Sequence, residues 1–260
     1  MEPVFNQLLP LLNTLWWPFV RILAMFSAAP LIGEMTLPMP VRVLLSVVLA
    51  IIMLPLAASG AEVDPFSLHG VATTVEQSLI GLVMGLAFHL AMAVIMVLGY
   101  LVSSQIGLSM AVMNDPLNGT SSDVVSSLLV TMCALVFFAV DGHLLLVGVV
   151  GASFGAWPVG SGISMPTLQA LSLNVAWVFS AAMVLAVPMV FATMVVQIGF
   201  GFLNRVAPSL NLFSLGFALV TVFGLFMLGH VARFVPQHYV RMCAQVLDML
   251  QQQMRAVSHG

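Results

Sequence analysis

Histidine and cysteine are the residue types in this sequence that most often bind metals, so their spacing is the first test for chemistry. No pair of them has the spacing of a zinc or haem site. His89 lies in an apolar stretch and has no second ligand three or four residues away. Cys133 and Cys243 are far apart, and Cys133 lies within an apolar run, where a small buried side chain is the more usual role than a disulfide. The sequence therefore predicts no metal and no cofactor. The six histidines are His69, His89, His143, His230, His238 and His259.

Ionisable side chains inside apolar segments are candidates for function, because each costs several kcal/mol, roughly, unless it is paired or hydrated. We expect Arg21 to reach the membrane interface, with a buried pair to a partner chain as the alternative. Glu76 precedes an apolar run and Asp141 closes one, so both are expected at segment boundaries. No carboxylate stands in the middle of a segment, as a proton or ion pathway would need. Serines such as Ser109 have no neighbouring His-Asp pair, so we predict that the protein is not an enzyme.

Composition decides the protein class. Hydrophobic residues make up 61% of the 260 residues and charged residues 6%, and the sequence contains no lysine. Uncharged runs cover residues 43–61, 77–114, 142–204 and 206–232, and each is long enough for a membrane-spanning helix. With a net charge of −3 and no basic stripe, a nucleic-acid partner is excluded. The sequence predicts an all-α integral membrane protein in contact with lipid.

About six long apolar segments are expected, some kinked by internal prolines and arranged as hairpins. Two of them, at residues 71–102 and 168–202, are longer than a perpendicular span requires. The tail after residue 233 is expected to be an amphipathic helix with Val240, Val246, Leu247 and Leu250 on one face. The six segments are residues 8–29, 41–58, 71–102, 124–140, 168–202 and 211–232.

One face of the third segment carries small residues around a single imidazole. Gly81, Gly85, His89 and Ala93 recur every four residues, so another helix can approach this face closely. Packing within the chain and a subunit contact are equally consistent with the pattern.

The middle stretch, residues 103–123, is polar and rich in turn residues, which predicts a loop. Its apolar side chains are not explained by lipid contact, and irregular backbone at membrane depth survives only where protein or a passage covers it. We therefore expect this loop either to be buried against protein or to line a passage that it can close, with an ordinary surface loop as the alternative. The candidate residues are Gln105, Gly107, Leu108, Met110, Val112, Met113, Asp115, Pro116 and Gly119.

Two stretches carry a family resemblance. Residues 204–217 read NRVAPSLNLFSLGF and residues 105–116 read QIGLSMAVMNDP. Both resemble the FliR family, the export-gate membrane proteins of flagellar and related type III secretion systems, and length and hydrophobic pattern agree along the whole chain. The spacing of the Asn-Arg, Pro and Asn-x-Phe-Ser residues in the first stretch has no general structural cause, so we expect these residues to act in assembly. They are Asn204, Arg205, Pro208, Asn211, Phe213, Ser214 and Gly216.

The resemblance implies a core subunit of the flagellar export gate. Such a subunit forms a helical channel with FliP and FliQ homologues, associates with an FlhB-like subunit, and passes unfolded flagellar proteins across the bacterial inner membrane. It would lie in the flagellar basal body, partly above the membrane plane on the periplasmic side. Residues 1–122 would be FliP-like and include the plug loop 103–122, residues 123–202 would form central hairpins, and residues 203–260 would be FliQ-like.

A second hypothesis is a secondary transporter with a substrate site at the membrane midplane, between broken helices. Inverted repeats and charges within the segments would favour it. The sequence shows neither.

Overall fold

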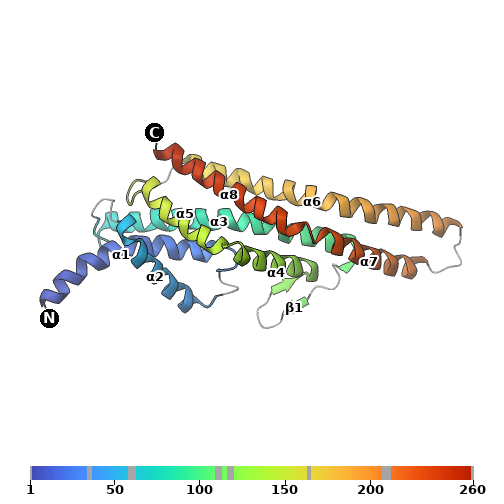
Figure 1. Ribbon diagram of the computed structural model, residues 1–260, viewed down its shortest axis with the longest axis horizontal. Helices are drawn as coiled ribbons and strands as arrows, with labels where there is room; N and C mark the ends of the chain where they lie inside the picture. Colours follow the sequence, from blue (N-terminus) through green and yellow to red (C-terminus); the bar gives the residue numbers. More distant parts are fainter. Residues whose placement is uncertain are drawn as a thin grey trace. The chain divides into compact units, whose positions relative to one another are not determined.

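The computed structural model describes residues 2–33, 37–57, 63–108, 113–115, 120–162, 165–206 and 212–258. Within these ranges the chain is helical apart from one short hairpin and the connecting turns (Figure 1). The all-α prediction is therefore confirmed. The helices are α1 (Glu2–Ala28), α2 (Met39–Ala57), α3 (Leu68–Gln105), α4 (Val124–Ala139), α5 (Gly142–Ala156), α6 (Met165–Val206), α7 (Leu212–Val231) and α8 (Val235–Ser258).

Helix length and hydropathy agree with a membrane protein. Among the described residues, four helical stretches are long and apolar enough to cross a membrane, or up to six if each of two bent helix pairs forms one span. The four are Pro10–Ala28, Met39–Ala57, Leu68–Gln105 and Val175–Val206. The upper number equals the six segments that the sequence predicts.

The fourth segment is broken where the sequence indicates. Asp141, between α4 and α5, has a φ of 56°, in the left-handed region. A helix cannot continue through that conformation, so a new helix starts at Gly142.

The middle loop holds a structure that the sequence analysis did not predict. Strands β1 (Met113–Asp115) and β2 (Thr120–Ser122) pair antiparallel, with Met113 opposite Ser122 and Asp115 opposite Thr120. Strands of three residues are too short to show an alternating pattern. Residues 116–119, which connect them, lie outside the described part of the chain.

The amphipathic tail is a helix, α8, but its apolar face differs from the predicted one. Val240 is 37% exposed, so its placement on the buried face was wrong. Val240 and Val246 are six residues apart, about 240° around a helix, whereas Tyr239 and Val246 are seven apart and nearly aligned. The buried stripe is Tyr239, Met242, Val246, Leu250 and Met254.

The chain forms two compact units. The first contains residues 1–90, 138–174 and 243–260, and the second contains residues 91–137 and 175–242.

In the first unit, α1, α3 and α5 supply the most deeply buried side chains, and α2 packs on α1 and α5. Gly81 and Gly85 of α3 lie directly against the main chain of α1, since a Cβ at either glycine would come within 3.0 Å of a backbone nitrogen there. Their face therefore packs within the chain. His89 is half-buried. The core includes Ile22, Met25, Phe26, Met84 and Phe154, each at most 2% exposed.

In the second unit, the end of α3 packs on α4. Gly99 lies against Ser126, where a Cβ would stand 2.8 Å from the Ser126 nitrogen, and the Oγ of Ser126 donates to the carbonyl of Met96 at 3.1 Å. Cys133 is fully buried, as expected of a small apolar side chain. Ala93 is half-buried. The core of this unit includes Ile95, Leu98, Val102, Leu129 and Cys133.

Candidate functional site

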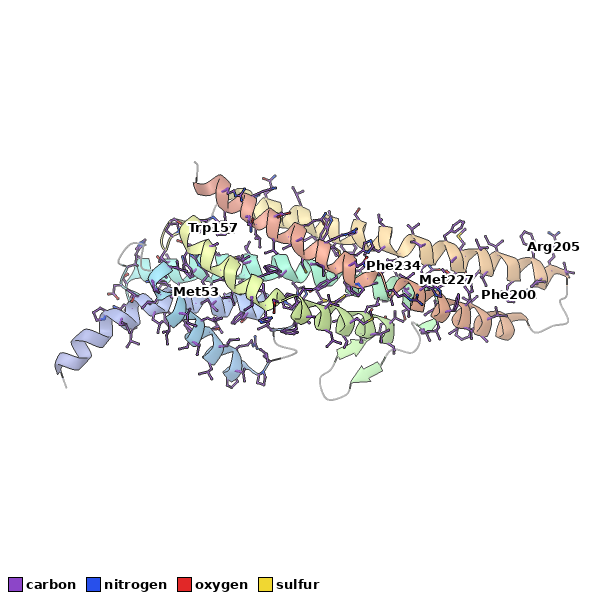
Figure 2. The ribbon with its side chains drawn as sticks, in the orientation of Figure 1. Met53, Trp157, Phe200, Arg205, Met227 and Phe234 are labelled. Atoms are coloured by element: carbon purple, nitrogen blue, oxygen red, sulfur yellow. The ribbon has the colours of Figure 1, made fainter. Side chains whose placement is uncertain are left out.

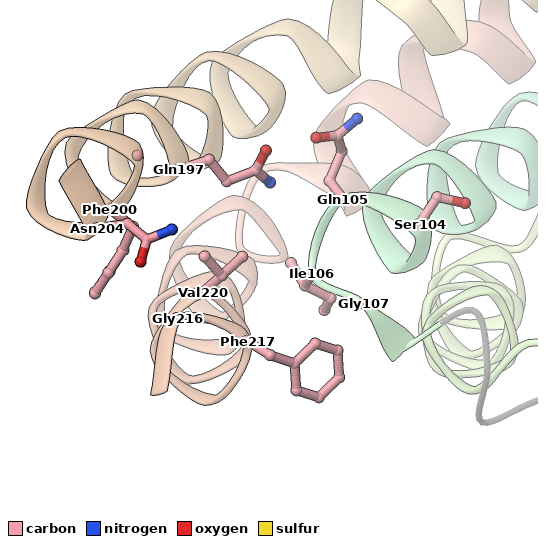
Figure 3. A pocket seen from close by; sticks show the side chains of 11 residues that line it. Ser104, Gln105, Ile106, Gly107, Gln197, Phe200, Asn204, Gly216, Phe217 and Val220 are labelled. Carbon is pink, nitrogen blue, oxygen red and sulfur yellow. The ribbon is translucent and has the colours of Figure 1, made fainter. Parts of the chain in front are cut away.

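The structure brings the start of the middle loop and the 204–217 stretch together in one hollow of the second unit. The hollow lies between the ends of α3 and α6 and the first half of α7, and has a volume of about 460 Å³ (Figure 3). The sequence predicts importance for both stretches but not their proximity. The lining residues are Ser104, Gln105, Ile106, Gly107, Gln197, Phe200, Gly201, Asn204, Gly216, Phe217 and Val220.

The first end of the middle loop is fixed on α7. Ile106 is fully buried, and its carbonyl accepts a hydrogen bond of 2.9 Å from the Oγ1 of Thr221. The Ile106 side chain fills the space left by Gly224, where a Cβ would lie 2.7 Å from the Cβ of Ile106. Gly107 has a φ of 78° and faces the ring of Phe217, which would be 2.6 Å from an added Cβ. Both the backbone conformation and the space at residue 107 therefore require glycine.

The second end of the loop is fixed by Asp123. Its carboxylate accepts hydrogen bonds from the backbone nitrogen and the Oγ of Ser126, at 2.9 and 2.8 Å, and so caps the start of α4. The same carboxylate accepts a hydrogen bond from the Oγ of Ser103, a fully buried residue of α3. One carboxylate thus joins the helix that enters the loop to the helix that leaves it.

The predicted plug residues are placed only in part. Gln105 and Gly107 line the hollow, and Leu108 is half-buried beside it. Met113 and Asp115 belong to β1. The remaining predicted residues, Met110, Val112, Pro116 and Gly119, lie outside the described residues. Closure of a channel by this loop stays a prediction.

Only some residues of the 204–217 stretch lie at the hollow. Asn204 and Gly216 line the hollow, and Phe213 and Ser214 lie in the first turn of α7. Arg205 is exposed on the last turn of α6 and makes no hydrogen bond within the described part of the chain (Figure 2). Pro208 and Asn211 lie outside the described residues.

Sequence reasoning missed Gln197, which comes into the hollow from α6. A signal was present, because Gln197 is the one carboxamide between residues 175 and 203. A lone amide in an apolar run indicates a polar environment on that face of the helix.

Arg21 in the first unit corrects another prediction. Arg21 is fully buried within the chain, so it neither extends to the membrane interface nor pairs with a partner chain, and both predicted placements were wrong. Its Nε donates to the Oε1 of Gln77 at 2.8 Å, its Nη1 to the Oγ of Ser153 at 3.0 Å, and its Nη2 to the carbonyl of Trp157 at 2.8 Å. The guanidinium also lies 4.1 Å from the ring centre of Phe154. Acceptors within the chain therefore satisfy the charge.

Glu76 extends this network. Its Oε1 accepts hydrogen bonds from the Nε2 of Gln77 at 3.1 Å and from the backbone nitrogen of Gly160 at 3.2 Å. The network ties α1 and α3 to α5 and to the turn that follows it. We interpret it as structural. The described residues also contain no group of three or more His, Cys, Asp or Glu side chains that could hold a metal.

Comparison with known proteins connects these features to a family. Residues 12–246 match the model of the bacterial export proteins, family 1. The chain is 32% identical to the flagellar biosynthetic protein FliR of Pectobacterium carotovorum subsp. carotovorum, over 90% of each chain, and 26% identical to FliR of Escherichia coli K12, over 96% of each. It is 24% identical to the surface presentation of antigens protein SpaR of Salmonella typhimurium, over 89% of this chain and 88% of SpaR.

Proposed function

Since the chain belongs to family 1 of the bacterial export proteins, we propose that it is a core membrane subunit of the flagellar type III export gate. In this role it forms, with FliP and FliQ homologues, the channel through which unfolded flagellar proteins cross the inner membrane. An FlhB-like subunit associates with it in the basal body, and part of the assembly stands above the membrane plane on the periplasmic side. Residues 1–122 are the FliP-like part, residues 123–202 the central hairpins and residues 203–260 the FliQ-like part.

Exposed apolar helix faces leave surface for other subunits as well as for lipid. On α2, Leu44 and Ile52 are 66% and 65% exposed, and on α6, Val184 and Phe191 are both 68% exposed. Side chains of this kind must be covered by lipid or by protein. Arg205 sits among exposed apolar residues on the last turn of α6, and a charge there favours protein cover.

We further propose that the middle loop closes the channel at rest, and the observation that supports this gating role is the anchoring of the loop at both ends. Asp123 holds the two flanking helices together, and Ile106 is locked against α7. A loop whose two ends are fixed can close a passage without detaching from its wall. Its apolar residues Leu108, Met110, Val112 and Met113 are of the kind that excludes water without a strong specific bond.

The test is to shorten residues 108–118 while keeping both anchors. The shortened protein should still co-purify with its partner subunits but should make cells leak small ions. A matched variant replaces the same residues by a glycine-serine stretch of equal length, which keeps the length and removes the apolar surface, and it should leak as well. Normal export without added leak from a shortened protein that assembles would refute the gating role.

A further inference from the structure

The hollow contains three carboxamides without partners. Gln105 comes from the end of α3, while Gln197 and Asn204 come from α6 (Figure 3). Within the described part of the chain, none of these side chains makes a hydrogen bond. Gln197 and Asn204 are exposed and Gln105 is half-buried, so the two donors and the acceptor of each carboxamide are open to a hydrogen-bonding molecule in the hollow.

Gln197 is the most informative of the three because of its surroundings. It lies within the candidate span Val175–Val206, of which little is buried. The neighbouring polar side chain on this helix, Thr193, is satisfied by its own helix, since its Oγ1 donates to the carbonyl of Met189 at 3.0 Å. The side chain of Gln197 makes no such hydrogen bond to its own helix. This face of α6 must therefore meet water or a hydrogen-bonding molecule and not lipid.

The rest of the lining has a specific chemical character. None of the lining residues carries a charge, and the aromatic residues Phe200 and Phe217 also line the hollow. Gly201 and Gly216 leave the backbone accessible. Neutral amides beside aromatic rings offer hydrogen bonds and apolar contact at once, without selecting a charge.

An extended polypeptide presents this same chemistry whatever its sequence. Its backbone carries one donor and one acceptor per residue, which a carboxamide can match in either direction. Weak, uncharged contacts also let the exported polypeptide dissociate and move along the channel, as transport requires. We propose that the hollow holds the main chain of the polypeptide in transit, through Gln105, Gln197 and Asn204, independently of its sequence. The inference rests on the proposed function, because the hollow adjoins the anchored base of the proposed plug.

Crosslinking tests the contact directly. The whole assembly is expressed in cells with an export substrate whose C-terminus is fused to a tightly folded domain, so that the substrate stalls in the channel. Gln197 is replaced by photoreactive benzoyl-phenylalanine. The matched control places the same group at Val195, which is 54% exposed, does not line the hollow, and lies about 200° away around the helix. We expect the substrate to be captured from position 197 and not from position 195.

Two other results overturn the inference. Capture of only a neighbouring subunit from position 197 would mean that the hollow is an assembly contact. Equal capture of substrate from both positions would remove the specificity of the hollow. Either result can occur while loop shortening still causes leak, so this inference can fail although the proposed function stands.

Charge variants test the sequence independence. Gln197→Glu should slow export of a substrate with an acidic segment, relative to a neutral one, by roughly fivefold, the effect of a like charge a few ångströms away in a hydrated site. Gln197→Asn should leave this ratio near one. A Gln197→Glu variant that slows every substrate equally would indicate a structural role and would contradict the proposal.

Discussion

The Nη1 of Arg21 donates a hydrogen bond of 3.0 Å to the Oγ of Ser153, a residue 132 positions further along the chain. Together with the bonds to Gln77 and to the carbonyl of Trp157, it holds three separate stretches of the first unit around one buried charge. Each of these acceptors is left without its donor if the guanidinium is removed.

We expect Arg21→Ala to destabilise the subunit by about 3 kcal/mol or more, because buried acceptors would be orphaned and a cavity left beside Phe154. Arg21→Lys should be intermediate, since lysine keeps the charge but loses the planar fork. The measurement is the melting temperature of the purified assembly in detergent. Arg241→Ala, on the exposed side of α8, is the control and should not change it. Equal melting temperatures for the wild type and Arg21→Ala would show that the network adds no stability.

The close approach of α1 and α3 gives a second prediction. Gly85→Ala would place a Cβ 2.8 Å from the Cβ of Ala28 and 3.0 Å from the nitrogen of Ala29, so the helices must separate. We expect a loss of about 1–3 kcal/mol in stability and a lower amount of the protein in membranes. Gly148 in α5 is the matched control, because nothing lies within 4 Å of an added Cβ there. Gly148→Ala should be neutral or stabilising by about 0.5–1 kcal/mol. If the two variants behave alike, helix propensity and not packing decides the outcome.

The helices and the break at Asp141 could be predicted because charge, glycine and proline mark them locally in the sequence. The environment of Arg21 could not, because its acceptors Gln77 and Trp157 lie 56 and 136 residues away. The candidate site shows the same limit. Residues at both sides of the hollow were identified, but the contact of Ile106 with Thr221 joins positions 115 residues apart. Only the fold brings them together.

Arg205 gives a prediction about assembly. Its side chain is exposed and bonds to no described residue, so we expect it to bond to the carbonyls that close helices of neighbouring subunits. Arg205→Ala should then reduce co-purification of the partner subunits and export more than Arg205→Lys does. Arg233→Ala changes another exposed arginine and serves as the control. Normal export by Arg205→Ala would show that the residue is only an interfacial anchor.

The carboxylate of Asp123 should decide whether the middle loop closes. It accepts hydrogen bonds from Ser103 of α3 and from Ser126 of α4, so Asp123→Ala removes the α4 cap, worth about 1 kcal/mol, and separates the two sides of the loop base. A loss of this size is too small to unfold the subunit, and the assembly should still form. The base of the loop should then be held less firmly, and the cells should leak small ions during expression.

Two comparison variants should leak less. Asp123→Asn keeps an acceptor oxygen for the cap and should leak less than Asp123→Ala. Thr221→Val removes the hydrogen bond to the Ile106 carbonyl but leaves Ile106 packed against Gly224, and it should also leak less than Asp123→Ala. The measurement is ion conductance of cells that contain equal amounts of each assembled variant. If Asp123→Ala assembles and its ion conductance equals that of the wild type, the base of the loop does not control closure.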